Sequence, residues 1–226
     1  MLYLYTIQKL LKDKKDKMHI MKHCERYPLE LTKFKTDNYK PGDHYRIPQR
    51  WDNFTMHAPL WTEVLNHYFE DKSDLLFLEL GSGNGLCANF LLDNYKCTLH
   101  TVDIEETRIV KEGEDEYEVS TLKNLQPFID QGRCNFHHMN TKQYLSSHQD
   151  YQYDFIYVDA SHDKDWVLYD AVNSFSLLKT EGLLIFDDYG WGDCALGIDA
   201  FTKCFEKHIH VIHRGWQIFL HKVSDL

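Results

Sequence analysis

The sequence predicts an α/β fold built on a mostly parallel sheet of seven strands, with helices on both faces. Apolar runs of strand length alternate along the chain with segments of helical spacing, which is typical of a parallel sheet. The clearest buried runs are Leu75–Leu80 and Asp154–Val158. Two short segments near the end, His210–His213 and Trp216–His221, predict a closing antiparallel hairpin.

The remaining elements follow in chain order. The five expected parallel strands are Leu75–Leu80, Thr98–Val102, Cys134–His138, Asp154–Val158 and Leu183–Phe186. The expected helices cover residues 51–69, 86–92, 120–129, 142–147, 164–178 and 196–205. The acidic segment Glu105–Glu118, which contains Gly113, is expected to be a surface loop.

Length and composition predict a basic, partly irregular arm over residues 1–50 and one domain over residues 51–226. No apolar run approaches the roughly 18 residues of a membrane span. The N-terminus turns polar within a few residues and has no small-residue cleavage site, so we expect no signal peptide. The six cysteines form no C-x-x-C pair, which favours reduced thiols and a cytoplasmic protein.

Charge is spread unevenly along the chain. Residues 1–50 carry 12 Lys and Arg against 6 Asp and Glu, whereas residues 51–226 carry 13 against 29. An acidic main domain argues against nucleic acid as a partner. The basic segment Lys9–Lys22 suits either an acidic partner or a solvated terminus. The sequence leaves open whether the protein forms a homo-oligomer.

A glycine turn follows the first strand and predicts a cofactor site. Gly81, Gly83 and Gly85 stand at alternate positions after Glu79, and Leu86 occupies the place of the third glycine in a dinucleotide fingerprint. Glu79 can organise the turn amides and a bound ammonium group. This E-x-G-x-G-x-G pattern resembles the first motif of class I S-adenosylmethionine-dependent methyltransferases. The alternative is a purely structural strand-to-helix turn. Ser82, inside the turn, is included among the expected cofactor residues.

Two further positions complete the predicted cofactor site. Asp103 ends the second strand, where a carboxylate can accept hydrogen bonds from both ribose hydroxyls. A solvated strand-end carboxylate is the alternative. Asn140 and Thr141, after the third strand, are expected to line the adenine.

Three aspartates end the fourth and fifth strands and predict a metal site. Asp159, Asp187 and Asp188 should converge at the edge of the sheet that holds the cofactor. Their mutual repulsion calls for a cation, and hard divalent ions such as Mg²⁺ take oxygen ligands. Such an ion can hold a substrate oxygen and favour its ionised form. In the alternative reading, one aspartate caps a helix and another is solvated. Asp159 is also expected to contact the cofactor and to take part in catalysis with His162.

His162 lies three residues past Asp159 and is the predicted catalytic base. Histidine is a common general base in enzymes, because an imidazole group can take a proton from a substrate hydroxyl. The chain contains 14 histidines, so a surface or helix-capping role is the alternative.

Over residues 51–222 the chain resembles a branch of class I O-methyltransferases. This branch is similar to macrolide-sugar O-methyltransferases and cephalosporin-hydroxylase-like proteins, and more distantly to catechol O-methyltransferase. The segments that carry the resemblance are Phe54–Trp61, Phe77–Gly85, Asp154–His162, Leu177–Tyr189, Ile198–Phe201 and Gly215–Gln217. Ala160 departs from the glycine usual in the branch, and residues 1–50 have no counterpart.

The resemblance implies a Rossmann-like class I methyltransferase sheet. It also implies a divalent metal at Asp159, Asp187 and Asp188, and a catalytic base at His162. We therefore expect methyl transfer from S-adenosylmethionine to a hydroxyl of a small molecule or sugar. Trp191, Tyr189 and the N-terminal arm are candidates for the wall beside the acceptor, and a place in the core is the alternative for the two aromatic residues. The alternatives are a metal-independent methyltransferase and a non-catalytic cofactor-binding module. Leu86 and the closing hairpin disfavour an NAD-dependent dehydrogenase.

Overall fold

The fold is taken from a computed structural model, which describes residues 39–45, 52, 54–112 and 115–225. Of the predicted basic arm, only residues 39–45 fall within this range. The expected start of the first helix at Trp51 and the expected loop residue Gly113 lie outside it. None of the helices in the described part of the chain is long and apolar enough to span a membrane.

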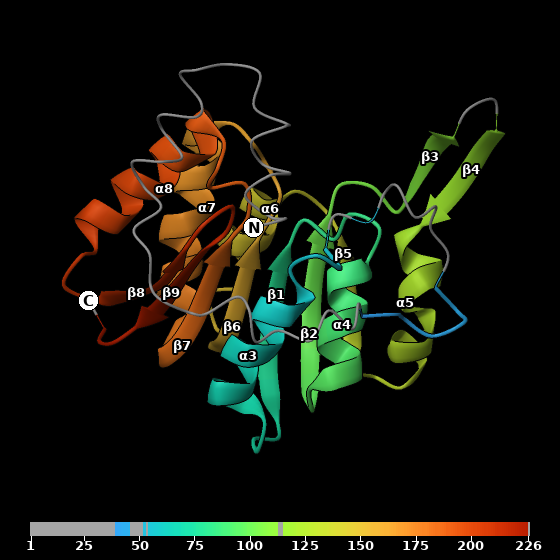
Figure 1. Cartoon of the computed structure of the whole chain (residues 1–226), viewed down its shortest axis with the longest axis horizontal. Helices are drawn as coiled ribbons and strands as arrows, with labels where there is room; N and C mark the ends of the chain where they lie inside the picture. The colour runs from blue at the N-terminus through green and yellow to red at the C-terminus, as the bar shows by residue number, and fades with distance from the viewer. Residues whose placement is uncertain (1–38, 46–51, 53, 113–114, 226) are drawn as a thin grey trace.

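Seven strands form one sheet, as predicted, in the order β5-β2-β1-β6-β7-β9-β8 (Figure 1). The strands are β1 (Leu75–Leu80), β2 (Cys97–Asp103), β5 (Cys134–His138), β6 (Tyr153–Val158), β7 (Leu178–Phe186), β8 (Ile209–Arg214) and β9 (Ile218–Lys222). Strands β5, β2, β1, β6 and β7 pair in parallel, and β9 pairs antiparallel with both β7 and β8. The predicted hairpin therefore closes the sheet beside the fifth parallel strand.

Within the described part of the chain, three helices cover each face of the sheet. The helices are α3 (Ala58–Phe69), α4 (Leu86–Asn94), α5 (Thr121–Asp130), α6 (Thr141–Ser147), α7 (Lys164–Leu177) and α8 (Gly192–Cys204). Successive residues of a strand point to opposite faces. Phe77 of β1 accordingly packs in the core under α3, α4 and α5, whereas Leu78 packs in the core under α6, α7 and α8.

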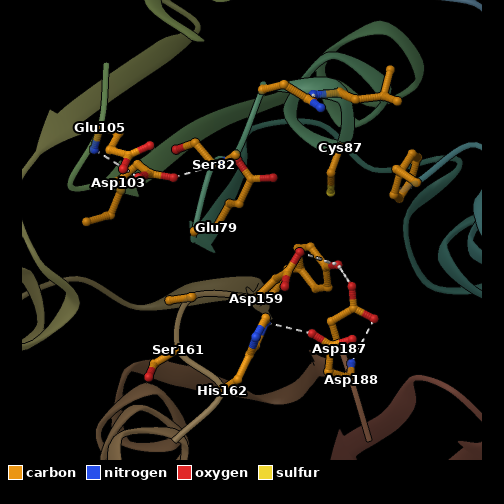
Figure 2. Close-up of a pocket in the computed structure, with 18 of the residues that line it drawn as sticks. Glu79, Ser82, Cys87, Asp103, Glu105, Asp159, Ser161, His162, Asp187 and Asp188 are labelled. Atoms are coloured by element: carbon orange, nitrogen blue, oxygen red, sulfur yellow. Dashed lines mark hydrogen bonds and ion pairs between the residues drawn. The ribbon is translucent and has the colours of Figure 1, made fainter. Parts of the chain in front are cut away.

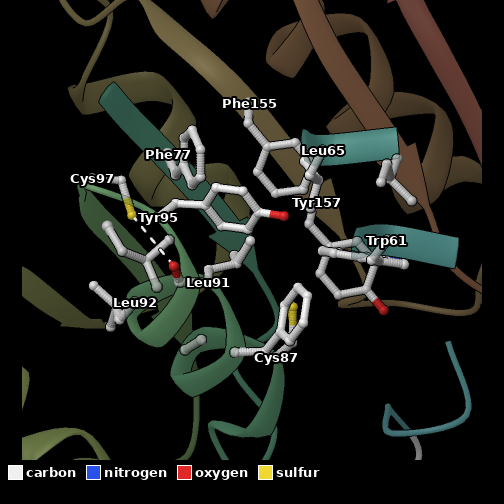
Figure 3. Close-up of a cluster of buried hydrophobic side chains, with 14 of the residues drawn as sticks. Trp61, Leu65, Phe77, Cys87, Leu91, Leu92, Tyr95, Cys97, Phe155 and Tyr157 are labelled. Carbon is white, nitrogen blue, oxygen red and sulfur yellow. Dashed lines mark hydrogen bonds between the residues drawn. The ribbon is translucent and has the colours of Figure 1, made fainter. Parts of the chain in front are cut away.

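The first of these cores is organised around a tryptophan of α3 (Figure 3). Trp61 has no exposed surface and packs edge-on against Phe155 and Tyr157. Its indole nitrogen donates to Gln217 Oε1 at 2.8 Å, so its polar atom is satisfied in the interior. The contacts join α3 to the central strand β6, which is followed directly by Asp159 at the site.

The segment predicted as an acidic surface loop is instead a β-hairpin, so that prediction was wrong. β3 (Thr107–Glu112) and β4 (Asp115–Ser120) pair antiparallel as a separate two-stranded sheet, which projects from the domain (Figure 1). Opposite charges on the two strands pair directly, as in the 2.6 Å ion pair between Lys111 and Glu116. The prediction of a loop rested on the acidic composition and overlooked both this pairing of charges and the β-branched residues of the segment, which favour a strand.

Candidate cofactor and metal site

An open cleft of about 1060 Å³ lies at the carboxyl ends of the parallel strands. Figure 2 shows Glu79 and Asp103 on one side of it, facing Asp159, His162, Asp187 and Asp188. Of the predicted site residues, those that line the cleft are Glu79, Gly81, Ser82, Gly83, Asp103, Asn140, Asp159, His162, Asp187 and Asp188. Gly85 does not line it. Gly85 forms the N-cap of α4 and packs toward Leu125.

The glycine turn brings the backbone of β1 close to that of β6. Gly81 has a φ of 95°, and a Cβ atom there would lie 1.9 Å from the carbonyl oxygen of Asp159. Only glycine fits both the conformation and the contact. Gly83 also has a positive φ of 55°, but a Cβ there would meet only the Arg108 side chain, at 4.0 Å. The turn is thus tight on the Asp159 side and open toward the cleft.

Glu79 is buried under the turn with one carboxylate oxygen unsatisfied. Its Oε2 accepts a short hydrogen bond from the Thr101 hydroxyl, whereas its Oε1 has no partner. Burial raises the pKa of Glu79 to about 8. A buried acceptor without a partner is costly unless a ligand supplies a donor. The residues present therefore fit a cationic donor, such as the ammonium group of S-adenosylmethionine.

Asp103, at the end of β2, is already hydrogen-bonded on both oxygens. The amides of Gly83 and Glu105 donate to Oδ2 and Oδ1 at 2.9 and 3.0 Å. Arg108 Nη2 lies 3.1 Å from each oxygen. We did not predict Arg108 as a site residue because it lies in the segment expected to be a loop. The β-branched residues around it, Thr107, Ile109 and Val110, were the signal that could have revealed a strand.

Asn140 caps α6 with its side chain. Its Oδ1 accepts from the Gln143 amide at 2.9 Å, and Gln143 Oε1 accepts in return from the Asn140 amide. The hydroxyl of Thr141 donates to the buried Asp170. Both residues still line the cleft, beside Met139, at the end predicted for adenine.

Asp159, His162 and Asp188 form a cluster whose potential ligand atoms all lie within 4.8 Å of one another. His162 Nε2 is 2.8 Å from Asp188 Oδ2. Asp187 is oriented differently: its Oδ2 accepts from the Tyr157 hydroxyl at 2.9 Å and its Oδ1 from the Asp188 amide. Asp188 has a φ of 53°, a strained value of the kind found at functional sites.

The electrostatics of this cluster favour a cation. Burial and the neighbouring charges of Asp187 and Asp188 raise the pKa of Asp159 well above its usual range. Burial and Asp187 also raise the pKa of Asp188 to about 6, although His162 opposes the shift. A divalent ion would stabilise both ionised carboxylates. The carboxylates of Asp159 and Asp188 therefore fit such an ion, with the imidazole of His162 beside them.

Two tryptophans line the cleft beside the cluster. The ring of Trp191, 46% exposed, packs edge-on against His162 with centroids 4.6 Å apart, and Trp216 lies next to it. Tyr189, the other expected wall residue, does not line the cleft. It is buried, and its hydroxyl donates to Asp199 at 2.7 Å.

The charges that line the cleft are strongly unbalanced. The carboxylates are those of Asp52, Glu79, Asp103, Glu105, Asp159, Asp187 and Asp188. Among the described residues, Arg108 is the one arginine or lysine that lines it, and it is paired with Asp103 and Glu105. The cleft therefore favours cations and disfavours phosphate groups.

Comparison with known proteins agrees with this geometry. The model of a methyltransferase domain family matches residues 78–189, just under half of the chain. The match extends from β1 to the end of the Asp187-Asp188 segment, so it spans both the glycine turn and the acidic cluster. The sequence has no significant match among curated proteins.

Solved structures with the same fold differ in what they methylate. A putative rRNA methylase from Clostridium thermocellum superposes with a TM-score of 0.56 and 13% identity, covering 74% of this chain and 96% of its own. The N-methyltransferase NodS from Bradyrhizobium japonicum, bound to S-adenosylhomocysteine, gives 0.51 and 14%, covering 81% and 94%.

The MycE methyltransferase of mycinamycin biosynthesis, in complex with Mg and S-adenosylhomocysteine, gives a TM-score of 0.55 and 16% identity. It covers 82% of this chain, which spans 56% of the MycE chain. At these identities the likeness concerns the fold, a mostly parallel seven-stranded sheet closed by an antiparallel hairpin. Residues 78–189 therefore resemble a methyltransferase domain, and the chain shares its fold with solved methyltransferases.

Proposed function

We propose that the protein transfers a methyl group from S-adenosylmethionine to a hydroxyl of a small molecule or sugar, assisted by a divalent ion. The observation that carries this proposal is the cluster of Asp159, His162 and Asp188, which faces the glycine turn across one cleft. Because Gly81 lies against the backbone of Asp159, a cofactor on the turn and an acceptor at the cluster would be neighbours.

The cofactor would lie along the ends of β1 and β2. Glu79 would receive its ammonium group, because Oε1 is buried and without a partner. The turn, including Ser82 and the open side of Gly83, would approach the methionyl and ribose parts. Asp103 would accept from the ribose hydroxyls, and Asn140 would lie by the adenine.

The metal would be held by Asp159 and Asp188. When bound, Mg²⁺ or another divalent ion supplies positive charge that favours the ionised form of an acceptor hydroxyl. Asp187, the third predicted ligand, would lie beside the ion without binding it, because its carboxylate accepts a hydrogen bond from the Tyr157 hydroxyl.

The acceptor hydroxyl would lose its proton and gain the methyl group. His162 would take the hydroxyl proton, with Asp188 orienting the imidazole at 2.8 Å. The acceptor oxygen forms a bond to the methyl carbon as the carbon–sulfur bond breaks, leaving S-adenosylhomocysteine. Positioning of the two reactants and neutralisation of charge would supply most of the rate.

The same cleft limits the acceptor. Among the described residues, the cleft offers a phosphate backbone no arginine or lysine other than Arg108, which is paired with acids, so we infer a small molecule and not the RNA that some proteins of this fold methylate. The exposed ring of Trp191 beside His162 offers a flat apolar wall to an aromatic or sugar ring.

A chelation experiment tests the proposal. Methyl transfer to a panel of compounds with vicinal hydroxyls is measured after exhaustive chelation and again after Mg²⁺ is added back. Turnover should fall to background and then recover. The Asp188→Asn variant should bind Mn²⁺ about tenfold or more weakly in the presence of S-adenosylhomocysteine. Asp165→Asn, at an exposed aspartate of α7, is the matched control.

A metal-independent methyltransferase is the second candidate. It is favoured by the 2.8 Å contact between His162 and Asp188, since such a pair can act as a base without an ion. Full turnover after chelation would select this candidate. A wild type that binds the cofactor tightly but methylates no acceptor, and a His162→Ala variant that behaves the same way, would instead indicate a non-catalytic binding module.

A further inference from the structure

Arg108 reaches into the cofactor end of the cleft from the β3–β4 hairpin. Its Nη2 lies 3.1 Å from both oxygens of Asp103, and its Nε lies 2.6 Å from Glu105 Oε2. The Asp103 side chain is 6% exposed, whereas that of Arg108 is 38% exposed. The guanidinium group therefore covers the edge of the carboxylate that faces the cleft.

The lone pairs of Asp103 leave little room for another donor. A carboxylate has about four acceptor positions. The amides of Gly83 and Glu105 occupy one on each oxygen, and Arg108 bridges the two that remain. A ribose diol that donates to both oxygens would need the positions that Arg108 holds.

We propose that Arg108 competes with the cofactor ribose for Asp103 and is displaced when the cofactor binds. This inference rests on the proposed placement of the ribose. It makes Arg108 a residue that weakens cofactor affinity, in contrast to a residue that binds the cofactor. Arg108 would influence methyl transfer only through Asp103.

Four contacts indicate why displacement is feasible. Asp103 is oriented by the two backbone amides, so it does not need Arg108 to hold its position. Arg108 keeps the carboxylate of Glu105 when it leaves Asp103, so its charge is not left unpaired. The base of the hairpin is tied to the turn by Thr121, whose hydroxyl donates to the Gly83 carbonyl at 2.6 Å. Rotation of one side chain is therefore sufficient.

The test is calorimetric titration of the full chain with S-adenosylhomocysteine. Arg108→Gln removes the charge but keeps a polar side chain of similar length. Arg108→Lys keeps the charge and should restore the competition. Lys111→Gln is the matched control, because it removes a charge from the same strand at an exposed ion pair with Glu116.

Arg108→Gln should bind about two- to fivefold more tightly than the wild type, the range that corresponds to loss of a partly exposed ion pair. The difference should shrink as NaCl rises from about 0.05 to about 0.5 M, because salt screens the ion pair. The lysine variant should lie near the wild type, and the Lys111→Gln variant should equal it.

Equal or weaker binding by Arg108→Gln would overturn the inference and show that Arg108 either does not touch the ribose site or assists the cofactor. Equal tightening by Lys111→Gln would also overturn it, because the effect would then be one of general charge. A wild type that does not bind S-adenosylhomocysteine would instead refute the proposed function itself.

Discussion

The buried carboxylate of Glu79 predicts that cofactor affinity depends on pH. Burial raises the pKa of Glu79 to about 8, so the free protein holds this group mostly protonated at pH 7. The ammonium group of the cofactor would pair with the ionised form. Binding at neutral pH should therefore release a proton from Glu79.

The magnitude follows from the fraction of Glu79 that is ionised. With a pKa of about 8, that fraction is about one tenth at pH 7 and about one half at pH 8. The association constant for S-adenosylhomocysteine should rise about tenfold from pH 6 to pH 7 and about fivefold from pH 7 to pH 8.

Calorimetry in buffers of different ionisation enthalpy measures both the affinity and the protons released. Glu79→Gln is close in shape but cannot titrate. Its affinity should be independent of pH between 6 and 8 and lower than that of the wild type at pH 8. In the free protein, a raised pKa means that stability is lost as pH rises from the unfolded pKa toward about 8. Glu79→Gln should therefore melt at a higher temperature than the wild type at pH 8.

Two results would refute this reasoning. A wild-type affinity that is flat over this pH range, with no net proton release, would mean that Glu79 does not meet the cofactor cation. A pH dependence that persists in the Glu79→Gln variant would assign the titration to another group.

Three further predictions concern the fold and the acceptor side. Gly81→Ala should abolish S-adenosylhomocysteine binding in calorimetry, because its Cβ would lie 1.9 Å from the Asp159 carbonyl oxygen. Gly132→Ala is the control, since it has a positive φ but no atom within 4 Å of the added Cβ. Trp61→Ala should lower the free energy of unfolding, measured in urea, by about 3–5 kcal/mol through the cavity it leaves. Trp191→Ala should keep cofactor affinity but raise the KM of the acceptor, because its exposed ring lies beside His162.

Each of these has a clear contrary outcome. If both glycine variants bind the cofactor equally well, close packing against Asp159 is not the reason that position 81 requires glycine. A loss below about 1 kcal/mol for Trp61→Ala would show that the core refills the space. Loss of cofactor binding in Trp191→Ala would place that ring in the cofactor site.

The parallel strands were predictable because burial on both faces makes them continuous apolar runs. Leu75–Leu80 is such a run and has the predicted bounds in the structure. Cys134–His138 also has the predicted bounds, although it is an edge strand with one buried residue and no continuous apolar run. β7 begins at Leu178, earlier than predicted. The prediction missed its first part because residues 179–181 are polar and partly or fully exposed. Polar ends of strands carry no distinctive pattern.

The hairpin and Arg108 were not predictable from composition. Pairing of β3 with β4 depends on cross-strand contacts, such as Arg108 opposite Val119, which an inspection of local acidity does not reveal. The contact between Arg108 and Asp103 also depends on the position of the hairpin next to the end of β2, which residue type does not indicate.

The sequence predicted that aspartates gather at this edge, but not how each would be oriented. Asp187 and Asp188 are adjacent, yet Asp188 joins Asp159 and His162 while Asp187 accepts from Tyr157. The left-handed backbone at Asp188 accompanies this division. Such a conformation depends on the packing around the turn and not on residue type.

A crystal structure with S-adenosylhomocysteine and Mg²⁺ would test the central claim most directly. The account predicts the ribose hydroxyls on Asp103, the ammonium group at Glu79 and the ion on Asp159 and Asp188. Clear density for S-adenosylhomocysteine elsewhere on the protein, or for an ion that avoids both aspartates, would contradict it.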